Sequence, residues 1–361
     1  MTEQYPSEQR PSDLAKTPLT KIPVTVITGF LGAGKTTLIK HLMANPQGKR
    51  LAVLVNEFGS LGVDGAILKA CADANCPAEN IVELANGCIC CTVAEDFIPT
   101  IEALMALPLR PDHIVIETSG LALPKPLLKA FDWPAIRSRI TVDGVVTLAD
   151  AEAVAAGRFA PDSGTPDSGA LAASDHETPL SEVFEDQIAC ADLVLLSKAD
   201  LAGVAGVAAA RKIIKTEMAS AGRSGLPILA MTEGVIDPRV ILGLAARAED
   251  DIAARPSHHD GEDGHEHDDF NTLVVSLGEV ADPEALQAAI VRLAREKNVL
   301  RVKGYVAVAG KPLRMLVQAV GSRVRAQYDR PWGSDPRRTE LVVIAEHHNI
   351  DAAAIRAVLE A

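Results

Sequence analysis

Between residue 22 and about residue 248, two patterns of hydrophobic residues alternate along the chain. Short runs of consecutive aliphatic residues, typical of strands buried on both faces, alternate with longer stretches of helical periodicity. The runs that we predict to be strands are 24–27, 51–55, 81–84, 113–116, 140–147, 193–196 and 227–230. Stretches such as 93–106 and 205–221 are predicted helices. This order predicts an α/β fold, in which a mainly parallel sheet has helices on both faces.

Three segments lack both of these hydrophobic patterns. Residues 1–21 are polar and contain proline, residues 159–179 are rich in Pro, Gly, Ser and Asp, and residues 255–269 contain mostly histidine and acidic residues. Such compositions cannot bury a core, so we predict a flexible tail, a flexible insertion and a linker. The first domain is therefore predicted to span residues 22–254.

The pattern changes after the linker. Strands are expected near 272–276, 300–308, 313–320 and 341–345, and helices at 283–297 and 351–359. Residues 270–361 are therefore predicted to form a small α+β domain.

Composition agrees with two packed domains in a chain of 361 residues. Hydrophobic residues make up 48% and aromatic residues only 3%, so the cores must be aliphatic. The formal net charge of −13 argues against a nucleic acid or an anionic membrane as partner. Apolar runs are too short for a membrane span, the first 21 residues are too polar for a signal peptide, and the six cysteines suit a reducing cytoplasm.

Residues 29–36 read Gly-Phe-Leu-Gly-Ala-Gly-Lys-Thr, between a predicted strand and a predicted helix. This is the phosphate-loop pattern Gly-x4-Gly-Lys-Thr in the context that it requires, and it predicts a P-loop NTPase. Backbone amides and the helix N-terminus surround the phosphates, Lys35 reaches the β- and γ-phosphates, and the Thr36 hydroxyl binds Mg²⁺. The nucleotide-binding residues expected here are Gly29, Gly32, Gly34, Lys35, Thr36 and Thr37.

Two further strand ends carry acids that suit this site. Glu117 ends an apolar strand in Ile-Val-Ile-Glu-Thr-Ser-Gly, and we expect it to hold the Mg²⁺ shell or an attacking water, as a catalytic residue beside Lys35. The Gly120 amide is expected to meet the γ-phosphate. Glu57, in Asn-Glu-Phe-Gly after the second strand, is either a ligand of Mg²⁺ or of a mobile metal, or a solvated turn acid.

The Ser-Lys-Ala-Asp sequence at residues 197–200 indicates guanine specificity. It follows a buried strand and resembles the motif Asn/Thr-Lys-x-Asp. The Asp200 carboxylate would accept hydrogen bonds from guanine N1 and N2, while the stem of Lys198 packs on the base. Ser197 replaces the usual asparagine. GTP is therefore expected in preference to ATP.

The sequence Cys-Ile-Cys-Cys at residues 88–91 indicates a metal site. Three thiolates within four residues suit a borderline cation such as Zn²⁺ or Co²⁺, and we assign Cys88, Cys90 and Cys91 as ligands. Small core cysteines or a redox pair are the alternatives. Cys71 and Cys76 lie upstream in a loop of small residues and are either further metal-binding or redox residues or unrelated to the metal site.

Two other features carry weaker signals. The histidines between residues 258 and 267 lie among carboxylates without apolar periodicity, so the segment is either a low-affinity metal collector or a solvated acidic linker. Cys190 lies in an apolar helical stretch and is predicted to be structural.

Together these motifs resemble the CobW family of P-loop metal-chaperone GTPases, and the resemblance covers nearly the whole chain. It implies a slow GTPase that uses Mg²⁺ and carries a metal at the Cys-x-Cys-Cys motif. The most similar branch of that family implies delivery of Co²⁺ to a cobaltochelatase subunit in aerobic cobalamin synthesis. The resemblance also leaves open a homodimer that depends on nucleotide.

The resulting hypothesis is a nucleotide-gated metal carrier, in which GTP and Mg²⁺ order the loops that hold the metal and hydrolysis or exchange releases it. Three alternatives remain open: a zinc-delivering GTPase, a non-catalytic metal buffer that nucleotide regulates, and a small-molecule kinase. The guanine motif argues against the kinase.

Overall fold

The computed structural model describes residues 21–56, 63–73, 76–84, 97–158, 179–257, 270–297, 299–333, 336–346 and 351–360. In the first part of the chain it places the strands β1 (Ile22–Gly29), β2 (Leu51–Asn56), β3 (Ile81–Leu84), β4 (His113–Glu117), β5 (Ile140–Asp150), β6 (Leu193–Ser197) and β7 (Ile228–Ala230). The helices between them are α1 (Lys35–Ala44), α2 (Val63–Lys69), α4 (Ile98–Met105), α5 (Pro124–Ala130), α6 (Pro134–Arg137), α7 (Ala151–Ala155), α8 (Pro179–Ala189) and α9 (Ala199–Ser220).

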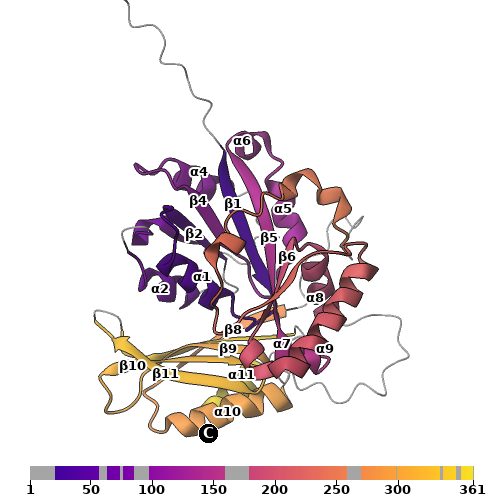
Figure 1. Ribbon diagram of the computed structural model, residues 1–361. Coiled ribbons are helices and arrows are strands. Elements are labelled where there is room, and N and C mark those ends of the chain that lie inside the picture. The colour runs from indigo at the N-terminus through magenta and orange to yellow at the C-terminus, as the bar shows by residue number, and fades with distance from the viewer. Residues whose placement is uncertain are drawn as a thin grey trace, which may run out of the picture.

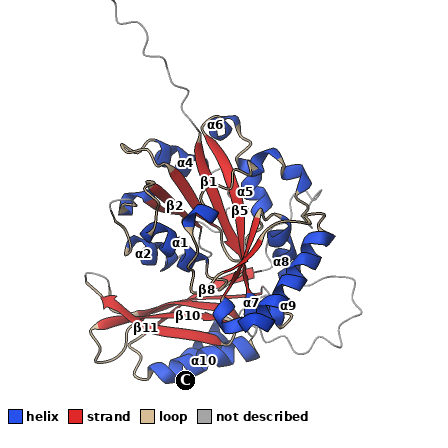
Figure 2. Ribbon diagram, viewed as in Figure 1, coloured by secondary structure: helices blue, strands red, loops and turns tan. Residues whose placement is uncertain are grey.

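These strands form one parallel sheet in the order β3-β2-β4-β1-β5-β6-β7, with helices on both faces (Figure 2). The predicted fold class is therefore confirmed. The sequence order reverses direction at β1, so the carboxyl ends of β1 and its neighbours meet at a topological switch point, where open α/β sheets bind ligands.

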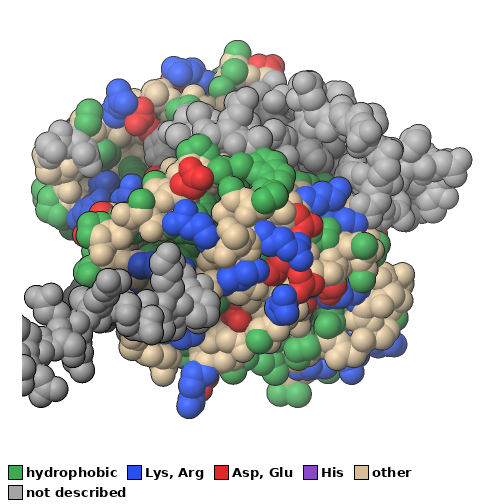
Figure 3. Space-filling model, turned by 90° about the horizontal axis from the view of Figure 1, so that it is seen from above, with side chains coloured by type: hydrophobic (Ala, Val, Ile, Leu, Met, Phe, Trp, Pro, Cys, Tyr) green, Lys and Arg blue, Asp and Glu red, His purple; other side chains and the backbone are tan. Residues whose placement is uncertain are grey.

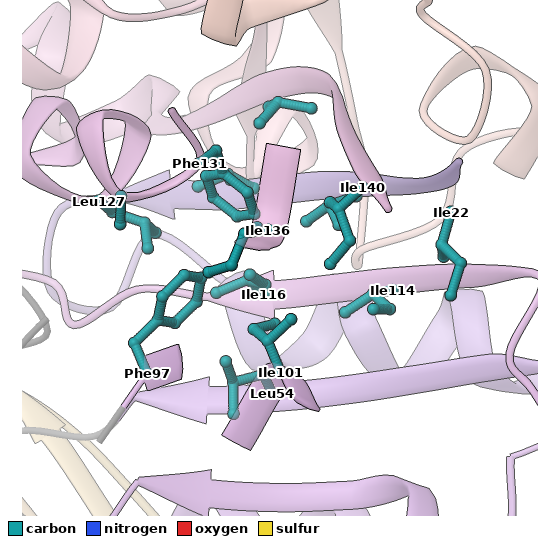
Figure 4. Close-up of a cluster of buried hydrophobic side chains, with 14 of the residues drawn as sticks. Ile22, Leu54, Phe97, Ile101, Ile114, Ile116, Leu127, Phe131, Ile136 and Ile140 are labelled. Carbon is teal, nitrogen blue, oxygen red and sulfur yellow. The ribbon is translucent and has the colours of Figure 1, made fainter. Parts of the chain in front are cut away.

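The continuous apolar runs arise because each central strand faces two cores. In β2, Ala52 and Leu54 belong to one cluster, while Leu51 and Val53 belong to the other. The first core packs against α4, α5 and α6, where Phe97 and Phe131 meet edge to face with ring centroids 5.3 Å apart (Figure 4). The second core packs against α1. With successive side chains on opposite faces, a strand covered on both sides is mostly apolar along its whole length.

The second part of the chain forms an antiparallel sheet in the order β11-β10-β9-β12-β8. Its elements are β8 (Phe270–Leu277), α10 (Pro283–Glu296), β9 (Val299–Val306), β10 (Leu313–Val320), β11 (Arg323–Pro331), β12 (Thr339–Glu346) and α11 (Ala352–Glu360). The sequence did not predict β11, because this edge strand is mostly exposed and polar and lacks the apolar signal of its neighbours.

The antiparallel sheet lies across the end of the parallel sheet, with α10 on its far side (Figure 1). Two apolar clusters join them. In one, Phe30, Leu31 and Leu121 pack with Leu300 and Ile344. In the other, residues of α2 pack with side chains of β9 and β10, namely Val63, Ile67, Tyr305 and Leu316. Because these clusters flank the phosphate loop, the second sheet covers the place where the sequence predicts the nucleotide.

Part of the predicted linker is packed structure. Arg255 is fully buried, and its guanidinium makes ion pairs of 2.8 Å with both Asp192 and Asp251. The histidine-rich residues 258–267 lie outside the described residues. The domain boundaries, including the insertion at 159–179, stay predictions.

On the face seen in Figure 3, Lys and Arg side chains are interspersed with Asp and Glu and with hydrophobic residues. Within the described part of the chain, none of the helices combines the length and the apolar character that crossing a bilayer requires.

Candidate functional site

A pocket of roughly 160 Å³ lies at the carboxyl ends of the central strands. Its lining brings together most of the predicted nucleotide residues, which are Gly32, Gly34, Lys35, Thr36, Thr37, Glu117, Gly120 and Lys198. Gly29, Ser197 and Asp200 lie near it in the chain but do not belong to the lining that the described residues form.

The phosphate loop has the backbone that its glycines permit. Gly34 caps α1 with φ +100°, and Gly32 has φ +70°, both in the left-handed region. A Cβ at Gly32 would lie only 2.6 Å from Val320 Cγ2 of β10. The loop is therefore held against the second sheet, and a side chain at Gly32 has neither the backbone freedom nor the space.

Lys35 is buried and turned toward its own loop. Its ammonium donates hydrogen bonds to the carbonyl oxygens of Gly29 at 2.7 Å and Phe30 at 3.2 Å. Burial lowers the pKa of Lys35 to about 8, and the nearby Glu117 carboxylate opposes that shift. A bound phosphate would favour the ammonium form further, because it brings negative charge to a site with little solvent.

The Thr36 hydroxyl lies between two carboxylates. Its Oγ1 is 2.9 Å from Glu117 Oε1 and 2.9 Å from Asp64 Oδ1. A hydroxyl has one proton and can donate to only one of them at a time. Burial raises the pKa of Glu117 to about 7, helped by the neighbouring Asp64 carboxylate. A protonated Glu117 can donate to Thr36, so the cluster can be satisfied without a bound cation.

These oxygens fit a magnesium ion. Thr36, Glu117 and Asp64 offer hard oxygen donors, and Glu117 Oε2 is buried without a hydrogen-bond partner among the described residues. An ion held there would neutralise phosphate charge during transfer of the terminal phosphoryl group. Within the described ranges, His, Cys, Asp and Glu form no cluster of three that is arranged to hold a metal by themselves.

Asp64 is a site residue that the sequence did not reveal. It lies in the first turn of α2, it is buried, and it belongs to no spacing pattern that we recognised. Burial alone would raise its pKa, but Lys303 and Arg301 outweigh that effect and hold the pKa well below its ordinary value. Asp64 is therefore an anion that links the Thr36 hydroxyl to β9.

The second sheet supplies the roof of the pocket, which the sequence also did not predict. Its lining residues are Arg301 of β9, Gln318, Ala319 and Val320 of β10, and Arg323 and Arg325 of β11. These arginines lie on two strands of a separate predicted domain and belong to no recognised sequence motif. Only the packing of that sheet onto the loop places them at the nucleotide.

The predicted guanine end of the site has one residue in the pocket. Lys198 lines the pocket in a left-handed conformation, with φ +54°, and its ammonium lies 2.5 Å from Asp150 Oδ2. Burial lowers the pKa of Lys198, and Asp150 partly restores it. Ser197 is buried and donates to the Ala149 carbonyl at 3.3 Å, while Asp200 is exposed in the first turn of α9.

The predicted metal ligands Glu57, Cys88, Cys90 and Cys91 lie outside the described residues. The strands that lead to them are adjacent. Asn56, which ends β2 and lines the pocket, is the register partner of Leu84, which ends β3.

Two of the remaining cysteines are poor candidates for metal ligands. Cys76 and Cys190 are buried, and burial raises the pKa of each thiol to about 12, which keeps both protonated at neutral pH. Cys71 is exposed. The buried position of Cys190 agrees with the predicted structural role.

Comparison with known proteins agrees with this architecture. Residues 23–223 match the family model described as CobW/HypB/UreG, nucleotide-binding domain, and residues 270–361 match the cobalamin synthesis protein cobW C-terminal domain. A protein of Sinorhizobium sp named zinc chaperone CobW is 49% identical over 93% of this chain and 96% of its own length. A protein of the same name from Pseudomonas aeruginosa is 48% identical over 91% of this chain and 88% of its own. The zinc chaperone YjiA of Escherichia coli is 30% identical over 88% and 92%. The chain therefore belongs to the CobW/HypB/UreG family of P-loop nucleotide-binding proteins, in the group that carries the cobW C-terminal domain.

Proposed function

We propose that this protein is a GTP-dependent metallochaperone, which binds Mg²⁺ and GTP, hydrolyses GTP slowly and uses the nucleotide cycle to hold and release a divalent metal. The observation that carries this proposal is the Thr36 hydroxyl between Glu117 and Asp64, beside Lys35. These residues provide a charge for the phosphates, oxygen donors for Mg²⁺ and a carboxylate that can orient a water.

The link between nucleotide and metal is proposed from topology. Glu57 directly follows Asn56, which lines the pocket. Leu84 is the register partner of Asn56, and the segment with the three cysteines follows Leu84 in the chain. Both segments therefore leave the parallel sheet at its ligand-binding edge. A γ-phosphate with Mg²⁺ can order these segments and complete a thiolate site, and GDP lacks the group that does so.

Zn²⁺ and Co²⁺ are the two proposed cargoes. Zn²⁺ is supported by the names of the relatives from Sinorhizobium and Pseudomonas and by its higher affinity for most thiolate sites. Co²⁺ delivery to a cobaltochelatase is the second candidate and is supported by the sequence resemblance to cobalamin-synthesis proteins and by the match of residues 270–361. Under that candidate, low free zinc in the cell or the client protein selects the metal.

One titration tests the function and separates the cargoes. Co²⁺ and Zn²⁺ compete for the protein in the presence of Mg²⁺ and a non-hydrolysable GTP analogue, with a Cys88/Cys90/Cys91→Ser triple variant and a Cys71→Ser control. We expect a tight site of one metal per chain that the triple variant loses and the control keeps, since Cys71 is exposed and outside the motif. A site that survives in the triple variant would contradict the proposed metal ligands.

Turnover provides the second arm of the test. Phosphate release from GTP should be slow and should fall when Glu117→Gln removes the carboxylate beside Thr36. Transfer of the γ-phosphate to a small-molecule acceptor instead of water would favour the kinase alternative. Tight metal binding that ignores nucleotide would favour a metal buffer.

A further inference from the structure

Arg301 connects the second sheet to the phosphate end of the pocket. Its guanidinium lines the pocket, and its Nη2 is 3.2 Å from Asp64 Oδ2. The other oxygen of that carboxylate is 2.9 Å from Thr36 Oγ1. Arg301 therefore stands one carboxylate away from the hydroxyl that would hold Mg²⁺.

Several basic side chains gather at this end of the pocket. Asp64 makes ion pairs with both Arg301 and Lys303, and Lys303 is almost fully buried. With Lys35, three cations lie near the carboxylates of Asp64 and Glu117, and Glu83 lies near Lys303. An incoming polyphosphate would bring negative charge close to these buried cations, where little solvent screens the attraction.

We propose that Arg301 is a nucleotide-contacting residue that binds the terminal phosphate, so that the C-terminal sheet donates an arginine to the phosphate-loop site of the same chain. This inference rests on the proposed binding of GTP. A guanidinium has five N–H donors in a planar fork, so contact with Asp64 and contact with a phosphate oxygen are compatible.

Other basic residues of the roof fit this role less well. Lys303 contacts Asp64 but does not line the pocket. Arg323 makes ion pairs with Asp150 and Glu152, near Lys198 and the predicted base end. Arg325 lines the pocket from an exposed position. Among these arginines and lysines, Arg301 combines access to the pocket with contact to the carboxylate that Thr36 shares.

This role would join the two domains through the ligand. A terminal phosphate bound by Lys35 from below and by Arg301 from above would strengthen the contact between the phosphate loop and β9. The second sheet would then respond to the third phosphate of the nucleotide, because GDP offers no such group to Arg301.

Nucleotide affinity measured with full-length protein and Mg²⁺ tests the proposal. The probes are GDP and a non-hydrolysable GTP analogue, and the variants are Arg301→Gln, Arg301→Lys and the control Arg330→Gln. Arg330 is a half-exposed arginine on β11 that does not belong to the pocket lining. We expect Arg301→Gln to weaken the GTP analogue about tenfold and GDP by less than about threefold, as loss of a charge-assisted phosphate contact predicts. The affinity of Arg301→Lys for the GTP analogue should lie between those of wild type and Arg301→Gln. The control Arg330→Gln should bind both nucleotides as wild type does.

Two results would overturn the proposal. One is an equal change, or no change, in the affinities for the two nucleotides in Arg301→Gln. The other is an Arg301→Gln/Asp64→Asn double variant that prefers the triphosphate as strongly as Asp64→Asn alone, since Arg301 would then act only through Asp64. Melting temperatures identify any variant that fails to fold, in which case Arg301→Lys decides. If wild type binds neither nucleotide, the proposed function itself is wrong.

Discussion

Val320 of β10 packs against Gly32 of the phosphate loop, so that a Cβ at Gly32 would lie 2.6 Å from Val320 Cγ2. The loop that the sequence assigns to phosphate binding is thus in direct contact with the second sheet. Because Val320 and Gly32 both line the pocket, the shape of the loop depends on both domains.

We expect Gly32→Ala to weaken GTP binding and to lower the melting temperature. The methyl group would clash with Val320, and φ +70° adds a backbone cost of about 1–2 kcal/mol for any residue with a Cβ. Isothermal titration and thermal melts measure the two effects. In the Gly32→Ala/Val320→Ala double variant the contact with Cγ2 is removed, while Val320 Cβ at 3.0 Å and the backbone cost remain, so part of the loss should return. A double variant that is worse than the sum of the single variants would contradict the contact.

Lys35→Ala should abolish GTP binding while the chain stays folded. Among the described residues, the ammonium donates hydrogen bonds to carbonyl oxygens of its own loop, so the loss concerns the phosphates more than a packed core. Circular dichroism checks the fold and titration checks the affinity. The exposed Lys311 provides a control, Lys311→Ala, which should bind as wild type does. A folded Lys35→Ala variant with full GTP affinity would refute the phosphate-loop assignment.

Asp200→Asn should shift the preference from guanine toward xanthine nucleotides. The amide can donate to the 2-oxygen of xanthine, whereas the carboxylate accepts from the guanine amine. Competition among GTP, XTP and ATP measures the shift. Since Asp200 is exposed, the substitution should leave the melting temperature unchanged. Equal affinities of the wild-type protein for ATP and GTP would refute the assignment of guanine specificity.

His113 should make stability depend on pH. It is buried at the start of β4, with Nε2 2.8 Å from Thr25 Oγ1 and with Nδ1 lacking a partner among the described groups. Burial lowers its pKa from 6.5 to about 4, Asp143 partly opposes this, and Lys49 adds to it. Between those pH values the unfolded chain binds more protons than the folded chain. Stability is therefore full above pH 6.5 and is lost as the pH falls toward 4.

Chemical denaturation at pH 7 and pH 5 measures this effect in wild type and His113→Gln. In His113→Gln, the free energy of unfolding should differ less between pH 7 and pH 5 than it does in wild type. The control His41→Gln, on the partly exposed face of α1, should show the same difference as wild type. An unchanged pH dependence in His113→Gln would show that the buried imidazole does not titrate in this range.

The sequence predicted what local patterns encode. The parallel sheet followed from aliphatic runs with two buried faces, and the phosphate loop followed from the spacing of Gly29, Gly32, Gly34, Lys35 and Thr36. Asp64 and Arg301 were missed because Asp64 reaches Thr36, and Arg301 reaches Asp64, only through tertiary packing across long sequence separations. When a second domain contributes residues to a site, the spacing of the motifs in the first domain does not reveal them.

The role of GTP in metal binding is tested most directly by the metal affinity of one protein in three nucleotide states. Co²⁺, followed by its thiolate charge-transfer band, and Zn²⁺, measured by competition, are titrated into the apo, Mg·GDP and Mg·GTP-analogue forms. The account predicts one tight site per chain only with the GTP analogue. It also predicts an equal gain in nucleotide affinity when metal is bound, because linkage is reciprocal. Equal metal affinity in all three forms would contradict the account and reduce the protein to a metal buffer with an uncoupled nucleotide site.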